Sequence, residues 1–334
     1  MNKIFEILNK YYGYNSFRKG QYEIISNILR GRDSFCILPT GAGKSICYQI
    51  PALMFNGITI VISPLISLMK DQVDNLNSNG INARYINSTQ KLEVSDEIIE
   101  LCKKGEVKLL YIAPEKLENE FFKRKLRLLN ISQIAIDEAH CVSMWGHDFR
   151  KSYGLIAEFI DNLRIRPVVT AFTATATEIV RKDVINLLKL RNPYIYIGSF
   201  DRENLEIKLY IEEDKLELVK DIIREREGEA GIIYCATRKE VDGLYYYLKD
   251  LGYDVLKYHG GLKDSEKEFY QDEFLNENSN VMIATNAFGM GIDKSNIRYI
   301  IHFTIPKNIE GYYQEIGRAG RDGLSAKCYL FFNR

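Results

Sequence analysis

Residues 38–45, with the sequence LPTGAGKS, combine glycines, a lysine and a serine in a pattern that favours phosphate binding. The segment follows an apolar run at 34–38 and leads into a helical pattern, so its backbone N–H groups can surround a phosphate at the amino end of a helix. We expect Lys44 to reach the β and γ phosphates of a nucleotide and Ser45 to bind Mg²⁺. The strict pattern has glycine where Leu38 stands, and a glycine-rich turn with a solvated lysine is the alternative.

Two adjacent carboxylates, Asp137 and Glu138, end a second apolar run in IAIDEAH at 134–140. Ligands of parallel sheets gather at the carboxyl ends of strands, where both this pair and the glycine-rich loop are expected. We expect Asp137 to hold Mg²⁺ and Glu138 to polarise an attacking water. The alternative is an acidic cap on the next helix, which does not explain why the pair accompanies a phosphate-binding loop.

Two arginines, Arg318 and Arg321, lie three residues apart in YYQEIGRAGRDG at 312–323. A planar guanidinium group suits a phosphoryl oxygen in a way that a lysine does not. Across a cleft between two domains, one of them would be an arginine finger, which is worth about 10³ to 10⁵ in turnover. A surface loop with two solvated arginines is the alternative.

The only tryptophan, Trp145, lies in CVSMWGHDFRKSY at 141–153, together with Phe149 and Arg150. Such a loop offers stacking faces beside a phosphate partner, and stacking of a base on an aromatic ring is worth about 1–3 kcal/mol. The alternative is burial of the two aromatic rings in a core, which composition alone favours. The adjacent acidic pair favours a loop that reports to the hydrolytic site whether a polymer is bound.

The elements that must position these residues follow a strand–helix alternation. Helical patterns occupy stretches such as 67–80 and 177–190, between short apolar runs that are typical of buried strands. This alternation predicts parallel sheets with helices on both faces. The predicted strands of the front half are 34–38, 57–63, 108–114, 134–138, 168–174 and 194–200, and those of the back half are 206–212, 230–237, 254–260, 280–287, 297–306 and 326–333.

Two α/β domains are therefore expected, and a length of 334 residues agrees with two domains. The seam is predicted in the polar stretch 199–208, and we place the domains at 1–203 and 204–334. No short repeat or low-complexity tract is found in the sequence.

Composition narrows the class of protein. With 46% hydrophobic residues the chain can bury two cores, so intrinsic disorder is excluded as its main state. No run of 18 apolar residues occurs, and we expect neither a membrane span nor a signal peptide. The six cysteines never form a CxxC pair, which indicates free thiols in a reducing, intracellular compartment.

Net charge does not by itself indicate a polyanionic partner. The 45 basic residues balance the 45 acidic ones, although residues 206–334 hold 18 basic and 23 acidic residues, which leaves the front half mildly basic. This asymmetry permits a nucleic-acid face without requiring one.

Taken together, these segments resemble the helicase core of the RecQ DNA helicases, which belong to superfamily 2, over essentially the whole chain. The matching motifs are YGYNSFRKGQ (12–21), LPTGAGKS (38–45), ISPLISLMKDQV (62–73), YIAPE (111–115), DEAH (137–140), the aromatic-rich loop HCVSMWGHDFR (140–150), FTATAT (172–177), GIIYCATRKEVD (231–242), YHGGL (258–262), ATNAFGMGIDK (284–294) and QEIGRAGRDG (314–323).

The resemblance implies two RecA-like domains, each a mostly parallel sheet with helices on both faces, and it implies a role for individual residues. Gln21 would recognise the adenine edge with its amide donor and acceptor, so ATP would be preferred to GTP. The implied ATP-binding residues are Tyr14, Arg18, Gln21, Thr40, Gly41, Ala42, Gly43, Lys44, Ser45 and Asp293; the catalytic residues are Lys44, Asp137, Glu138, Gln314, Arg318 and Arg321; the metal ligands are Ser45 and Asp137; the coupling residues are His140, Thr173 and Thr175; and the DNA-binding residues are Ser63, Pro64, Trp145, Phe149 and Arg150.

The activity implied by the resemblance is ATP hydrolysis with Mg²⁺, stimulated by DNA and coupled to 3′ to 5′ translocation on single-stranded DNA and to duplex unwinding. The expected partners are single-stranded and 3′-tailed duplex DNA, with single-strand-binding or repair proteins, and the expected roles lie in DNA repair and recombination. The expected location is cytoplasmic, associated with the nucleoid in a bacterium, without a membrane partner.

The chain departs from the family pattern in places. Glu203 replaces a proline that is usual in this family, and the sequence stops at Arg334, where family members usually continue into a zinc module and a winged helix. We therefore expect no zinc and weak unwinding. The alternatives are a non-catalytic ATP- or DNA-binding regulatory fragment and an RNA-remodelling ATPase of superfamily 2.

Overall fold

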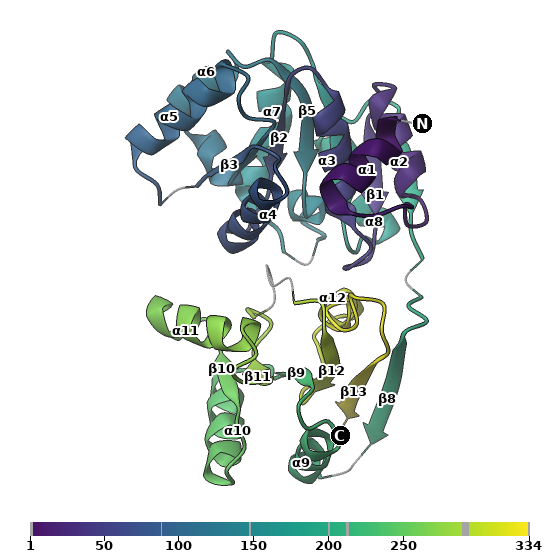
Figure 1. The fold of residues 1–334 in the computed structure, drawn as a ribbon, viewed down its shortest axis with the longest axis vertical. Coiled ribbons are helices and arrows are strands. Elements are labelled where there is room, and N and C mark those ends of the chain that lie inside the picture. The colour runs from purple at the N-terminus through teal and green to yellow at the C-terminus, as the bar shows by residue number, and fades with distance from the viewer. Residues whose placement is uncertain are drawn as a thin grey trace. The chain divides into compact units, whose positions relative to one another are not determined.

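The computed structural model describes residues 3–87, 89–146, 148–199, 201–211, 214–288 and 294–332. The chain divides into two compact units, Met1–Phe200 and Asp201–Arg334, and each is an α/β unit built on one sheet (Figure 1). Among the helices of the described ranges, none has the length and apolar character that a bilayer span requires.

The first unit contains a seven-stranded sheet in the order β3-β4-β2-β5-β6-β1-β7, and all of its strand pairs are parallel. Its strands are β1 (Ser34–Ile37), β2 (Ile58–Ile62), β3 (Ala83–Ile86), β4 (Leu109–Ile112), β5 (Ile131–Ile136), β6 (Val168–Thr173) and β7 (Tyr194–Ile197). Its helices are α1 (Lys3–Tyr12), α2 (Gln21–Leu29), α3 (Lys44–Met54), α4 (Ile66–Ser78), α5 (Leu92–Lys103), α6 (Glu120–Leu126), α7 (Leu155–Asp161) and α8 (Glu178–Leu187), with short 3₁₀ helices η1 (Pro114–Glu118), η2 (Ala139–Val142) and η3 (Lys151–Gly154).

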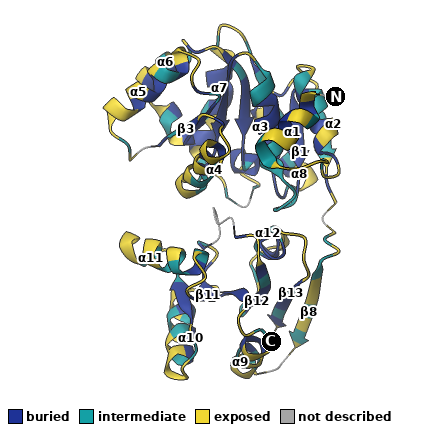
Figure 2. Cartoon of the chain, in the orientation of Figure 1, coloured by how far each residue is buried: buried dark blue, intermediate teal, exposed yellow. Residues whose placement is uncertain are grey.

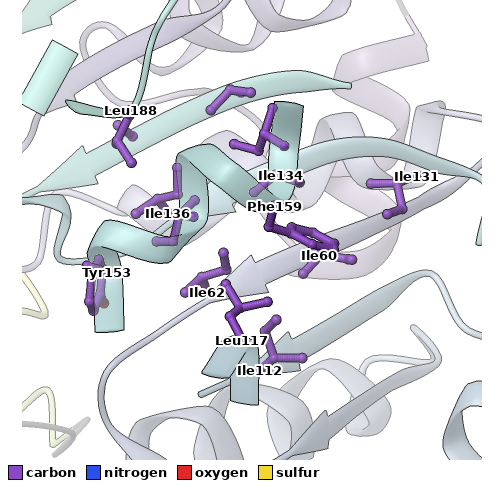
Figure 3. Packing of buried hydrophobic residues seen from close by; sticks show 14 of the residues in the cluster. Ile60, Ile62, Ile112, Leu117, Ile131, Ile134, Ile136, Tyr153, Phe159 and Leu188 are labelled. Carbon is purple, nitrogen blue, oxygen red and sulfur yellow. The ribbon is translucent and has the colours of Figure 1, made fainter. Parts of the chain in front are cut away.

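Both faces of this sheet are buried, because neighbouring residues of a strand point to opposite faces. On one face, Ile60 and Ile62 of β2 and Ile134 of β5 pack with residues of α5, α6, α7 and α8. Figure 3 shows these three side chains with Phe159 of α7. On the other face, Val61 and Ala135 pack with residues of α2, α3 and α4. The continuous apolar runs of the sequence are therefore strands that are covered on both sides.

The second unit contains a six-stranded parallel sheet in the order β10-β11-β9-β12-β13-β8. Helices α9 and α10 contribute to the core on one face, and α11 and α12 contribute to the core on the other. Its elements are β8 (Leu205–Ile211), α9 (Lys215–Glu225), β9 (Ala230–Tyr234), α10 (Arg238–Asp250), β10 (Leu256–Tyr258), α11 (Asp264–Leu275), β11 (Val281–Ala284), β12 (Ile297–His302), α12 (Ile309–Ile316) and β13 (Ala326–Phe332).

Every strand expected from the sequence is present, and the fold class is confirmed as two parallel sheets with helices on both faces. One strand, β3, was not expected. Its sequence, ARYI, has a polar residue and a half-buried tyrosine at its centre, because β3 is an edge strand of the sheet. The central strands are mostly buried, whereas exposed residues lie on the outer sides of the helices and on the edge strands β7 and β8 (Figure 2).

Candidate active site

The glycine-rich loop joins the end of β1 to the start of α3, as its sequence predicts. Gly41 and Gly43 have φ angles of 82° and 78°, which L side chains rarely adopt, and Gly43 is the N-cap residue directly before α3. The loop therefore ends at the amino terminus of an eleven-residue helix. Free N–H groups and the positive end of the helix dipole make such a terminus attractive to phosphate. Thr40, Ala42, Lys44 and Ser45 lie in this loop and in the first turn of α3, and all four are half-buried.

The side chains of Arg18 and Gln21 lie against this loop. Gln21 is buried, and its Nε2 donates to the carbonyl oxygens of Ala42 and Gly43 at 3.1 Å each. Its Oε1 accepts from the backbone N–H of Arg18 at 2.9 Å, and the Arg18 guanidinium donates to the carbonyl oxygen of Gly41. The structure thus brings two of the predicted adenine-contacting residues onto the loop, whereas Tyr14 is 53% exposed.

The acidic pair follows directly after β5. The Asp137 N–H donates to the carbonyl oxygen of Ile62 on β2 at 2.9 Å, which continues the sheet ladder, and its Oδ1 accepts from the Glu138 N–H at 3.0 Å. Glu138 has a φ of 47°, a conformation that non-glycine residues adopt at a cost of about 1–3 kcal/mol and that is enriched at functional sites. It precedes η2 without capping it through its side chain. Instead, Glu138 Oε1 lies 3.1 Å from Lys44 Nζ of the glycine-rich loop.

Burial raises the pKa of Asp137. The pKa of Asp137 is raised to about 6, first by burial and then by the negative charge of Glu138, while the Lys44 ammonium opposes the shift. Asp137 is therefore a carboxylate that lacks sufficient positive charge, which is the situation that a bound divalent cation relieves.

A chain of polar contacts leads from Glu138 to the end of β6. His140 is buried, and its Nδ1 lies 3.3 Å from Glu138 Oε2 and 2.8 Å from Thr173 Oγ1. The Thr173 hydroxyl donates its proton to the carbonyl oxygen of Thr175 at 2.9 Å, so it accepts from His140, and Nδ1 carries the proton. The three predicted coupling residues are thus connected to one of the two carboxylates that are predicted to be catalytic.

The Trp145 and Phe149 rings of the aromatic-rich loop are exposed. Trp145 and Phe149 are 75% and 46% exposed, so the alternative of core burial is wrong for both rings. Arg150 Nη1 donates to the carbonyl oxygen of Pro64 at 2.8 Å, which joins this loop to the segment after β2. Ser63, at the end of β2, is buried, and its hydroxyl has no hydrogen-bond partner among the described residues. Two of the predicted DNA-binding residues, Ser63 and Pro64, therefore follow β2. The other three lie in the aromatic-rich loop, which is hydrogen-bonded to the segment after β2.

In the second unit, Gln314 lies in α12 and the two arginines lie in the turns that follow it. Arg318 is buried beside Tyr234, whose pKa is raised to about 12 by burial while the guanidinium opposes the shift. The predicted ATP-binding residue Asp293 lies outside the described residues.

The sequence did not indicate two residues that contact the turns carrying Arg318 and Arg321. Arg202 and Asn204 hydrogen-bond to the backbone of the arginine-bearing turns. The only sequence signal was their place in a polar stretch at the seam, where side chains are usually solvated.

The fold and the site together define a class, the two-sheet helicase-type cores with a phosphate-binding loop and a DEAH motif. Residues 18–183 match the family of DEAD/DEAH box helicases, and residues 214–323 match the helicase conserved C-terminal domain. The fold is similar to that of Dbp5 from S. cerevisiae, solved with RNA and ADP BeF3, with a TM-score of 0.77 and 20% identity over 98% of this chain and 87% of the other.

Sequence relatives narrow the class to one family. The chain is 51% identical to the ATP-dependent DNA helicase RecQ of Bacillus subtilis, over 98% of this chain and 56% of the relative. It is 41% identical to the probable ATP-dependent DNA helicase RecS of the same species, over 99% of this chain and 67% of the relative. The chain belongs to the RecQ family of DNA helicases, and it spans about half the length of the RecQ relative.

Proposed function

We propose that this chain is an ATP-driven DNA translocase and helicase core, in which ATP hydrolysis at the glycine-rich loop moves single-stranded DNA in the 3′ to 5′ direction and opens duplex DNA. The proposal rests on one observation above the others. Lys44, Glu138 and His140 form a contact chain from the phosphate-binding loop through the acidic pair to Thr173. A nucleotide that enters this site must rearrange that chain.

Within this proposal, the loop amides and Lys44 hold the phosphates, and Ser45 and Asp137 hold Mg²⁺. When bound, Mg²⁺ neutralises charge on the phosphates and on the leaving group. Glu138 orients the attacking water and accepts its proton, which requires that its contact with Lys44 first opens. Arg318 and Arg321, with Gln314, supply polar and positive groups to the transferred phosphoryl group.

The DNA part of the proposal rests on the exposed rings of Trp145 and Phe149. Next to them in the sequence is Arg150, which hydrogen-bonds to the backbone of Pro64. Stacking on exposed rings holds a single strand without reading its sequence. A strand that displaces this loop acts on η2 and His140, because Trp145 follows them by only a few residues and its backbone N–H donates to Ser143 Oγ at 3.2 Å. DNA binding and hydrolysis are therefore joined by short covalent and hydrogen-bonded paths.

The test is the steady-state rate of ATP hydrolysis without polymer, with single-stranded DNA and with single-stranded RNA. We expect stimulation by DNA that exceeds stimulation by RNA, and displacement of a strand from a 3′-tailed duplex in preference to a 5′-tailed one. Greater stimulation by RNA would favour an RNA-remodelling ATPase. Binding of ATP and DNA without hydrolysis would favour a regulatory fragment.

A further inference from the structure

Two side chains at the start of the second unit hold the turns that carry the arginines. Arg202 Nη2 donates to the carbonyl oxygens of Ala319 and Gly320 at 3.0 and 2.8 Å, and its Nη1 reaches that of Gly317 at 3.5 Å. Asn204 Nδ2 donates to the carbonyl oxygens of Gly320 and Leu324, both at 2.9 Å. The two side chains are themselves joined, since Arg202 Nε donates to Asn204 Oδ1 at 3.3 Å.

These carbonyl oxygens have no hydrogen-bond donor within helix α12. Helix α12 ends at Ile316, and the backbone then runs through tight turns, so carbonyl oxygens at this end lack partners within the helix. A guanidinium group satisfies several of them at once because it presents donors in a rigid fork, and its charge suits the negative end of the helix. A single side chain thereby fixes the backbone on both sides of Arg318.

Gly320 allows this close approach. Its φ is +57°, and a Cβ there would lie 2.5 Å from Asn204 Nδ2 and 2.7 Å from the Leu324 carbonyl oxygen. The turn is also held from β12, because the Gly320 N–H donates to the carbonyl oxygen of Ile297 at 2.9 Å. The path of the backbone between Arg318 and Arg321 is therefore fixed from two sides.

We propose that Arg202 and Asn204 are positioning residues for Arg318 and Arg321, and this inference rests on the proposed function. Holding the turn presents the guanidinium groups in one orientation, so that they do not have to be ordered again in each catalytic cycle. Because the chain enters the second unit at Asp201, the first residues of the unit are bound directly to the turns that carry its arginines. A change in the path of this entry segment moves the turns with it.

The first test is a double-mutant cycle on DNA-stimulated ATP hydrolysis, run with the full chain. We expect Arg202→Ala to lower kcat by about 10- to 100-fold, the loss that follows a displacement of about 1 Å in a positioned group. Since the interaction is used in the transition state, kcat and kcat/KM fall together while KM for ATP changes little. In an Arg321→Ala background, Arg202→Ala then lowers kcat by less than it does alone, because only its effect through Arg318 remains. Arg202→Lys gives an intermediate kcat because lysine lacks the fork.

A glycine pair separates positioning from loss of stability. Gly320→Ala pushes against Asn204 and leaves every charge in place, whereas Gly323→Ala introduces a similar backbone strain, at φ +88°, with no atom within 4 Å of its Cβ. We expect the first variant to lower kcat as Arg202→Ala does and the second to keep it, with kcat of each variant measured well below its own melting temperature.

Three results would overturn the inference. They are a wild-type kcat for Arg202→Ala, equal kcat for the two glycine variants, and full additivity of Arg202→Ala with Arg321→Ala. If Arg321→Ala lowers turnover while Arg202→Ala does not, this inference alone fails. If Arg321→Ala leaves turnover unchanged, the role proposed for Arg321 fails and this inference fails with it.

Discussion

Lys44 Nζ and Glu138 Oε1 lie 3.1 Å apart, and both side chains are only 15% exposed. The lysine proposed to bind phosphate and the carboxylate proposed to orient water therefore hold each other in the structure. In the proposed mechanism a bound nucleotide would replace each partner, since its phosphates would take the lysine and the carboxylate would be released toward water. Under this proposal the ion pair holds Lys44 and Glu138 together in the nucleotide-free protein.

The buried carboxylate of Asp137 lowers stability, so Asp137→Asn is expected to stabilise the nucleotide-free protein at neutral pH. The pKa of this group is about 6 in the folded protein, above its ordinary value of 3.8 in the unfolded chain. The folded protein therefore binds the proton more tightly, and the cost of ionisation is fully present above about pH 6 and disappears as the pH falls below 3.8. A shift of this size corresponds to about 2–3 kcal/mol.

Denaturant unfolding between pH 4 and pH 8, without nucleotide or Mg²⁺, measures this effect. Glu178→Gln is the control, because a hydrogen bond from Lys182 lowers the pKa of that exposed carboxylate. The control is not expected to gain stability at neutral pH. An Asp137→Asn variant less stable than the wild type at pH 7.5 would show that the burial argument is wrong.

Trp145→Ala is expected to leave basal ATP hydrolysis nearly intact and to abolish its stimulation by single-stranded DNA. Loss of one stacking ring weakens DNA binding by about 5- to 100-fold. Fluorescence anisotropy of a labelled single strand and the ATPase rate at saturating DNA measure the two effects. Phe121 is 62% exposed elsewhere in the first unit, so Phe121→Ala should change neither. If single-stranded DNA still stimulates ATP hydrolysis by Trp145→Ala, the aromatic-rich loop does not bind the DNA.

Thr173→Val is expected to uncouple DNA binding from hydrolysis. The change removes the hydroxyl that accepts from His140 and donates to Thr175, so the DNA-dependent increase in rate should fall by about 5- to 100-fold while DNA affinity is kept. Thr170→Val on the same strand is the matched control, because Thr170 is equally buried but accepts from Gln133 instead. Equal effects of the two variants would indicate that only the packing of β6 matters.

Gln21→Ala distinguishes recognition of adenine from support of the glycine-rich loop. The amide of Gln21 is engaged with Ala42 and Gly43, so reading the base requires that some of these hydrogen bonds are exchanged. If Gln21 recognises adenine, KM for ATP rises by about 10-fold and the preference over GTP is lost. An equal rise for both nucleotides would assign Gln21 to the loop alone. Gln49→Ala, at a buried glutamine in α3, is the control for lost packing.

Much of the fold could be predicted because strands buried on both faces give largely apolar runs, as in ITIVI of β2 and LLYI of β4. The edge strand β3 gives no such run, since solvent replaces one neighbour and polar residues are tolerated there. The backbone conformation of individual site residues could not be predicted either. The left-handed backbone of Glu138 depends on its tertiary contacts, and no local pattern signals it.

The candidate site shows the same division. The motifs predicted which residues lie near the glycine-rich loop, and the structure brings Lys44, Glu138 and His140 into contact. The support given by Arg202 and Asn204 joins residues more than a hundred positions apart and uses backbone carbonyls, which carry no sequence signature. Contacts of that kind can be found only from a three-dimensional structure.

The central claim is that the site hydrolyses ATP through Glu138 when DNA is bound, and the most direct measurement compares Glu138→Gln with the wild type. The readouts are the affinity for ATP and the turnover at saturating single-stranded DNA. We expect ATP affinity to be retained or improved, since Lys44 is released from its ion pair, and turnover to fall by about 10² to 10⁴-fold, as for loss of a general base. A Glu138→Gln variant with wild-type, DNA-stimulated turnover would contradict the account.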